Sequence, residues 1–92
     1  MTELYVVGAG GLGIETVGLA RNINRTAGLW ENIFLIDDDN TKAGCLFNNC
    51  RVVGGMDYLL DASEKGAVDA LCAFGEPFYR FGFYERFRSR TG

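Results

Sequence analysis

The sequence predicts an α/β fold, a small three-layer domain with a short parallel sheet of about four strands and helices on its faces. Three observations lead to this prediction. Short apolar runs alternate with segments of helical periodicity, the runs end at glycine or aspartate, and 92 residues suffice for one domain only. Alternating strands and helices are typical of parallel sheets joined by right-handed crossovers.

The first two elements follow from a change of apolar period. Residues 4–7 (Leu-Tyr-Val-Val) are β-branched or apolar throughout and stop at Gly8, which predicts a buried strand. From Leu12 the period becomes helical, and one face then carries Leu12, Thr16, Leu19 and Ile23, with Val17 and Ala20 beside them. We expect this amphipathic helix to end near Gly28, since glycine permits the left-handed turn that closes many helices.

A second apolar run, residues 33–36, predicts another buried strand and ends at three consecutive aspartates. The elements predicted after it are a loop over 41–49, a short strand over 51–54, one or two helical turns over 56–62, a strand over 69–74 ended by Gly75, and a helix whose first turn holds Pro77.

The C-terminal segment is rich in aromatic residues, which surround a helical wheel instead of forming one stripe: Phe78, Tyr79, Phe81, Phe83, Tyr84 and Phe87. We expect such a helix to pack against something outside this chain, through self-association or against another domain. The alternative is a mixed helix with some aromatic side chains exposed.

The composition excludes several classes of protein. Hydrophobic residues make up 48% of the chain and charged residues 23%, as in a folded globular protein. No apolar run reaches membrane-spanning length, and no basic segment precedes an apolar one at the N-terminus, so we expect neither a membrane span nor a signal peptide. Residues 1–75 carry ten acidic and five basic groups, a poor match to nucleic acid.

The strongest motif is Gly8-Ala9-Gly10-Gly11-Leu12-Gly13, which fits G-x-G-x-x-G between a predicted strand and a predicted helix. In this pattern Gly8 allows the tight turn, Gly10 lets phosphates approach the backbone, and Gly13 lets the helix pack closely on the strand. The helix N-terminus then offers unpaired N–H groups to a phosphate. The alternative is that these glycines only shape a strand-to-helix turn.

Acidic residues follow the second strand at the same predicted edge of the sheet. Asp37 lies 29 residues after Gly8, where the acidic partner of a dinucleotide fingerprint is expected. One of the three aspartates at 37–39 can accept hydrogen bonds from a ribose or a base, while at least one is expected to cap a turn. Solvation or coordination of a cation such as magnesium is the alternative for the others. Gly75 ends a later strand at this edge, and Arg80 is a candidate phosphate partner or a plain surface residue.

Residues for catalysis and metal binding are scarce. The chain has no histidine, and its three cysteines, Cys45, Cys50 and Cys72, lack the spacing of zinc or redox pairs. We therefore expect free thiols in a reducing cytoplasm, no metal and no catalytic residue in this chain.

Four segments together resemble a known family: residues 4–13, then Phe-Leu-Ile-Asp-Asp at 34–38, Val-Gly-Gly at 53–55, and Phe-Gly-Glu-Pro-Phe-Tyr-Arg at 74–80. They are similar to the N-terminal domain of bacterial sugar acyltransferases of the sialic acid O-acetyltransferase and UDP-4-amino-sugar N-acetyltransferase type. The likeness spans nearly the whole chain.

The resemblance implies that residues 1–92 form one Rossmann-like domain that binds the nucleotide part of a UDP-sugar. Gly8, Gly10, Gly11 and Gly13 would form the phosphate-side turn, Asp37 and Asp38 would contact the uridine, and Gly75 and Arg80 would lie beside the crevice. It also implies a left-handed β-helix domain, not found in this sequence, that binds acetyl-CoA, forms a trimer and supplies a catalytic histidine.

Two other functions remain open at this stage. The glycine spacing also fits an NAD-binding fragment of an oxidoreductase. The aromatic C-terminal segment also fits a non-catalytic interaction module.

Overall fold

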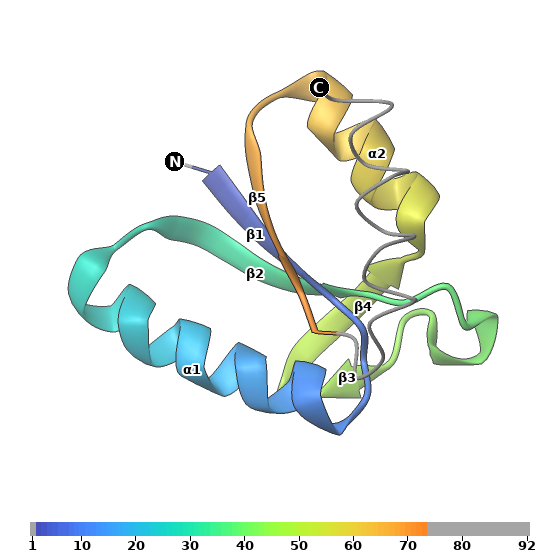
Figure 1. Cartoon of the computed structure of the whole chain (residues 1–92), viewed down its shortest axis with the longest axis horizontal. Helices are drawn as coiled ribbons and strands as arrows, with labels where there is room; N and C mark the ends of the chain where they lie inside the picture. Colours follow the sequence, from blue (N-terminus) through green and yellow to red (C-terminus); the bar gives the residue numbers. More distant parts are fainter. Residues whose placement is uncertain (1, 74–92) are drawn as a thin grey trace.

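The computed structural model describes residues 2–73 and places a mixed five-stranded sheet between two helices (Figure 1). The strand order is β3-β4-β2-β1-β5, in which β4, β2, β1 and β5 are parallel and the short β3 is antiparallel. The α/β class is confirmed. The predicted sheet of about four strands corresponds to the four parallel strands, and the fifth was missed.

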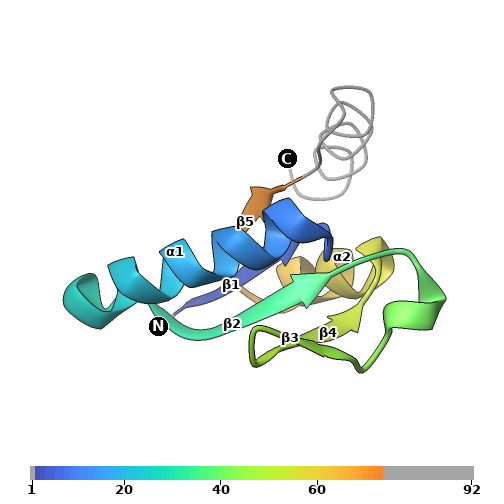
Figure 2. The same ribbon diagram turned by 90° about the horizontal axis from the view of Figure 1, so that it is seen from below.

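The elements have the following bounds: β1 Thr2–Val7, α1 Gly11–Ala27, β2 Trp30–Ile36, the 3-10 helix η1 Asn40–Lys42, β3 Leu46–Phe47, β4 Cys50–Gly54, α2 Met56–Lys65 and β5 Val68–Cys72. Figure 2 shows the β3 and β4 pair at one margin of the sheet and β5 at the other. No helix in this described part of the chain is long and apolar enough to cross a membrane. The predicted helix with Pro77 and the aromatic residues lies outside the described residues.

The helix α1 ends as predicted. Gly28 has a left-handed backbone (φ 60°), and its N–H donates to the Asn24 carbonyl oxygen. The Asn24 side chain then pairs with the backbone of Trp30, donating to its carbonyl at 2.9 Å and accepting from its N–H at 2.8 Å. This pairing ties the helix end to the sheet, and β2 begins at Trp30, three residues before the predicted strand.

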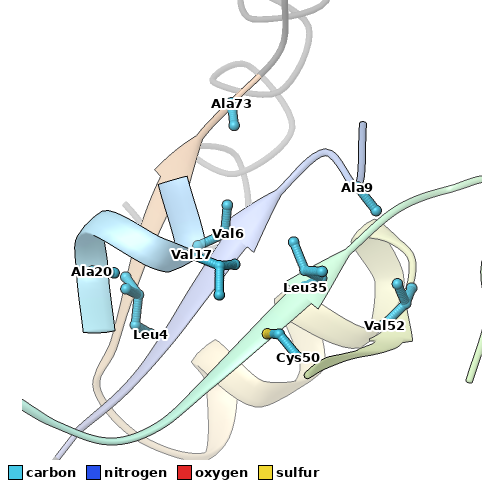
Figure 3. Close-up of a cluster of buried hydrophobic side chains, with 9 residues drawn as sticks. All are labelled: Leu4, Val6, Ala9, Val17, Ala20, Leu35, Cys50, Val52 and Ala73. Atoms are coloured by element: carbon cyan, nitrogen blue, oxygen red, sulfur yellow. The ribbon is translucent and has the colours of Figure 1, made fainter. Parts of the chain in front are cut away.

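The strand β1 is buried on both faces of the sheet because it lies between β2 and β5, with a helix on either side. Along β1, Leu4 and Val6 point to the α1 face and Tyr5 and Val7 to the α2 face, and each is at most 2% exposed. The core on the α1 face, drawn in Figure 3, consists of Leu4, Val6, Ala9, Val17, Ala20, Leu35, Cys50, Val52 and Ala73. Burial on both faces explains why β1 has a continuous apolar run over residues 4–7 instead of an alternating one.

The structure corrects the apolar face predicted for α1. Its buried residues are Gly13, Val17 and Ala20, whereas Leu12, Leu19 and Ile23 are 46%, 65% and 53% exposed. Small side chains let the helix axis approach the sheet, so the small-residue stripe packs and the larger residues beside it do not. The sequence periodicity shows that the helix is amphipathic but not which of two adjacent stripes contacts the sheet.

The segment predicted as a loop over 41–49 overlaps η1 and contains the short strand β3 and the tight turn to β4. Asn48 and Asn49 form the two-residue turn with positive φ angles of 50° and 58°. Asparagine tolerates this backbone, which favours a type I′ hairpin. Two smaller boundaries also differ: α2 continues to Lys65, and β5 ends at Cys72 instead of residue 74.

We expect Asn49→Val to destabilise the domain by about 1–2 kcal/mol, because a β-branched side chain strains a left-handed backbone. Urea unfolding followed by circular dichroism measures the change. Asn49→Gly is the control and should stay within about 0.5 kcal/mol of the original, since glycine adopts this backbone without strain. Equal stability of the valine and glycine variants would contradict the turn geometry.

Candidate functional site

The Gly-rich turn joins β1 to α1 at the carboxyl edge of the parallel strands. Gly8 has a φ of 108°, and its N–H donates to the Ile36 carbonyl oxygen at 2.7 Å. A Cβ on Gly13 would overlap the Gly8 carbonyl oxygen, a backbone atom. The fold itself therefore requires glycine at positions 8 and 13, as the motif predicts for the turn and for close helix packing.

Gly10 and Gly11 differ from the other two glycines of the motif. Both are exposed, and a Cβ at either position would meet no atom within 4 Å outside its immediate neighbours. Gly10 has extended backbone angles (φ −93°, ψ −169°) that other residues adopt easily. Neither packing nor backbone strain among the described residues explains why glycine occupies these two positions.

The N-terminus of α1 begins at this open part of the turn. Gly10 is its N-cap, no side chain among residues 2–73 caps it, and its first turn contains no acidic residue. The first N–H groups of a helix have no partner within the helix, and the 17 residues of α1 add a partial positive charge at this end. The arrangement can bind an anionic group through backbone donors.

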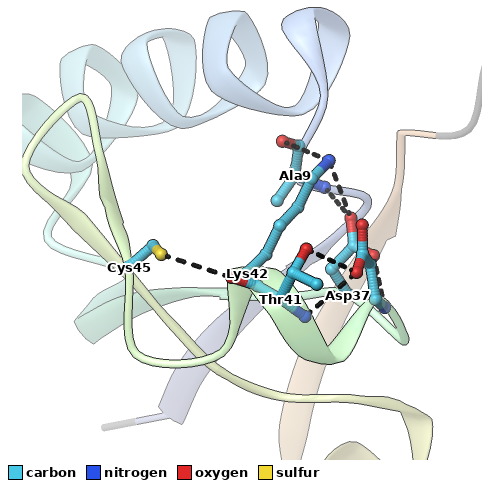
Figure 4. A network of polar contacts seen from close by, with 6 residues as sticks. Ala9, Asp37, Thr41, Lys42 and Cys45 are labelled. Carbon is cyan, nitrogen blue, oxygen red and sulfur yellow. Dashed lines mark hydrogen bonds and ion pairs between the residues drawn. The ribbon is translucent and has the colours of Figure 1, made fainter.

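The Asp37 carboxylate connects the Gly-rich turn to the end of β2 (Figure 4). Its Oδ2 accepts from the Ala9 N–H at 2.9 Å, and its Oδ1 accepts from the Asp39 N–H at 2.9 Å. The side chain is only 19% exposed. Asp37 therefore lies beside the predicted phosphate turn, as expected from the sequence, but it also holds this turn in place.

The next two aspartates act as caps, which confirms the expectation that at least one of the three would. Asp38 Oδ1 accepts from the Met56 N–H at 2.8 Å and so caps α2 from a neighbouring strand end. Gly55, the N-cap residue of α2, has no side chain, and a Cβ there would collide with that same Asp38 oxygen. Asp38 thus lies at the same sheet edge as Asp37, beside the start of the second helix.

Asp39 caps η1. Its Oδ1 accepts from the Thr41 N–H at 3.0 Å and from the Thr41 hydroxyl at 2.7 Å. Both hydrogen bonds lower the pKa of the Asp39 carboxyl, and the bond from the Thr41 hydroxyl has the larger effect. These bonds fix the short helix that carries Lys42.

Lys42 is a site residue that sequence reasoning missed. Its Nζ lies 3.4 Å from the Ala9 carbonyl oxygen and 3.7 Å from Asp37 Oδ2, above the Gly-rich turn (Figure 4). The segment around it has weak periodicity and reads as a loop, so no pattern in the sequence points to this position. Only the hydrogen-bonded turn at η1 brings the lysine to the motif.

The structure thus brings six of the eight predicted site residues to one edge of the sheet: Gly8, Gly10, Gly11, Gly13, Asp37 and Asp38. The other two, Gly75 and Arg80, lie outside the described residues. Among residues 2–73, no group of three or more histidine, cysteine or acidic side chains could hold a metal ion.

A glycine-rich turn between β1 and α1 of a parallel sheet, with an acidic residue after β2, defines a Rossmann-like α/β domain. Residues 3–87 match the family model of the PglD N-terminal domain. The chain therefore belongs to this family, the N-terminal domains of PglD-type sugar acetyltransferases. A comparison with curated proteins found no match. The family resemblance derived from the sequence is confirmed.

Proposed function

We propose that this domain binds the nucleotide part of a UDP-sugar at the Gly-rich turn, for a sugar acetyltransferase that acts on precursors of cell-surface glycans. The observation that carries the proposal is the open backbone at Gly10 and Gly11. Within residues 2–73 no contact requires glycine at these positions, and the missing side chains leave room for a ligand directly on the peptide N–H groups. Membership of the PglD N-terminal domain family supports a sugar-related ligand.

In this proposal the diphosphate lies over residues 10–12, at the positive end of α1. The uridine extends toward the end of β2, where Asp37 and Asp38 lie at the same edge. Each carboxylate oxygen can accept more than one hydrogen bond, so the bonds that Asp37 makes to Ala9 and Asp39 are compatible with a further donor from the ligand. Asp37 is then both a support of the turn and a ligand contact.

Acetyl transfer itself would belong to another domain of the parent protein. In this proposal that other domain binds acetyl-CoA, forms the trimer contacts and supplies a catalytic histidine, and this chain performs the nucleotide-binding step in the cytoplasm. Gly75 and Arg80 remain proposed neighbours of the same crevice.

Calorimetric titration of the purified chain with UDP and UDP-sugars tests the proposal. We expect saturable binding of UDP and weaker or no binding of NAD. The absence of binding heat with millimolar UDP would contradict the proposal. Binding of NAD without a response to UDP would favour a dinucleotide-binding domain instead.

Asp37→Ala is an ambiguous variant for this purpose, because it also removes the bonds to the Ala9 and Asp39 N–H groups. Loss of UDP binding in that variant could come from a displaced turn. The unmodified chain is therefore the protein to titrate first, and substitutions at the open glycines are the sharper second step.

A further inference from the structure

The position of Lys42 is determined by a short hydrogen-bonded segment. The Lys42 N–H donates to the Asp39 carbonyl oxygen at 3.0 Å, and the Asp39 side chain caps the same turn through Thr41. The backbone at position 42 is thereby held next to the Gly-rich turn, 33 residues away in sequence from Ala9. A lysine held in this way over a motif of backbone donors needs an explanation beyond surface solubility.

The contacts of the Lys42 ammonium to the Gly-rich turn and to Asp37 are both long. Its Nζ is 3.4 Å from the Ala9 oxygen and 3.7 Å from Asp37 Oδ2, whereas charge-assisted hydrogen bonds are usually about 2.7–2.9 Å. An ammonium has three donors, and this side chain is 33% exposed. Lys42 can therefore turn toward an incoming anion without breaking a short bond.

The geometry also places the ammonium close to the open glycines. The Ala9 carbonyl oxygen and the Gly10 nitrogen belong to one peptide group and are about 2.3 Å apart by standard bond lengths. The ammonium lies on the carbonyl side of this peptide, opposite the Gly10 N–H, so the flexible four-carbon side chain of Lys42 must swing across the turn to meet a phosphate bound on the Gly10 and Gly11 N–H groups. The same edge carries three aspartates, whose charge opposes an anionic ligand unless a cation is present.

We infer that Lys42 is the cationic residue that recognises the phosphates of the nucleotide at the Gly-rich turn, an inference that rests on the proposed function. Lys42 turns from Ala9 and Asp37 to the phosphates, while backbone N–H groups hold their other oxygens. It thereby adds to the preference for a nucleoside diphosphate over the uncharged nucleoside that the backbone N–H groups provide.

The test compares UDP with uridine, which lacks the phosphates, on the whole chain carrying Lys42→Gln. Binding is followed by nuclear magnetic resonance titration, which detects millimolar affinities. We expect the variant to bind UDP about tenfold more weakly, the loss of one charge-assisted contact, and uridine as the unmodified chain does. UDP binding by the variant should also depend less steeply on salt. Lys42→Arg should retain most of the UDP affinity.

Lys65→Gln is the matched control, since it removes an equal charge from an exposed lysine at the far end of α2. It should leave the affinity for UDP unchanged. Equal losses of UDP and uridine binding in Lys42→Gln would mean a purely structural role and would overturn the inference. An unchanged UDP affinity and salt dependence would overturn it as well, with the proposed function intact. No UDP binding by the unmodified chain would overturn both.

Discussion

Replacing Gly13 by alanine should destabilise the domain by about 3 kcal/mol or more, a large part of the stability of a chain this size. The new Cβ would overlap the Gly8 carbonyl oxygen and lie 2.8 Å from the Gly8 carbonyl carbon. Both are backbone atoms of Gly8, whose own N–H donates to the Ile36 carbonyl oxygen. Neither atom can therefore move aside without disturbing the end of β1. The helix must instead shift away from the sheet and open the core around Val17.

Thermal and urea unfolding of Gly13→Ala measure this loss. The matched control is Gly18→Ala in the same helix, where the nearest neighbour of a Cβ is the Asn48 amide nitrogen at an ordinary 3.6 Å. Alanine should be neutral or stabilising there by up to about 1 kcal/mol, because glycine inside a helix is unfavourable. A Gly13→Ala protein as stable as Gly18→Ala would mean that α1 does not approach β1 as closely as described.

The elements that are determined by residues within them or directly next to them could be predicted from the sequence. An apolar run followed by glycine marked β1, and Gly28 ended α1 because a left-handed residue is needed there. The glycines of the motif and the aspartate after β2 were likewise predicted to meet at one edge, because parallel strands share their carboxyl ends. The structure confirms this arrangement for Gly8, Gly13 and Asp37.

The features that were missed depend on contacts between distant residues. Asp38 caps α2 across 18 positions, and Lys42 reaches Ala9 across 33. A sequence pattern contains no signal for such a pair. The packed stripe of α1 was also decided by tertiary contact, since the small Gly13 and Ala20 fit against the sheet and the larger Leu19 does not. Hydrophobicity alone would predict that the face with Leu19 packs against the sheet.

Gly10→Val should reduce UDP binding at least about a hundredfold while leaving the domain folded. Valine branches into the space where we place the phosphate and covers the N–H groups at the start of α1. Losing two charge-assisted hydrogen bonds, at about 1.5–3 kcal/mol each, corresponds to at least that factor. The φ of −93° suits valine, and no atom of the described residues beyond the immediate neighbours lies within 4 Å of the new Cβ. The cost in stability should therefore stay near about 1 kcal/mol, that of a poorer N-cap.

Gly66→Val is the control for this experiment. Gly66 is also exposed and has an extended backbone (φ 171°), and in the part of the chain that the structure describes no atom beyond its immediate neighbours lies within 4 Å of a Cβ there. It follows α2, however, and not the Gly-rich turn. Its valine variant should bind UDP normally in the same titration. If Gly10→Val unfolds, Gly11→Val can be used in its place, because it covers the same N–H groups from an equally open position. If folded variants at both positions bind UDP like the unmodified chain, the phosphates do not lie on this turn, because no diphosphate could reach its N–H groups past those side chains.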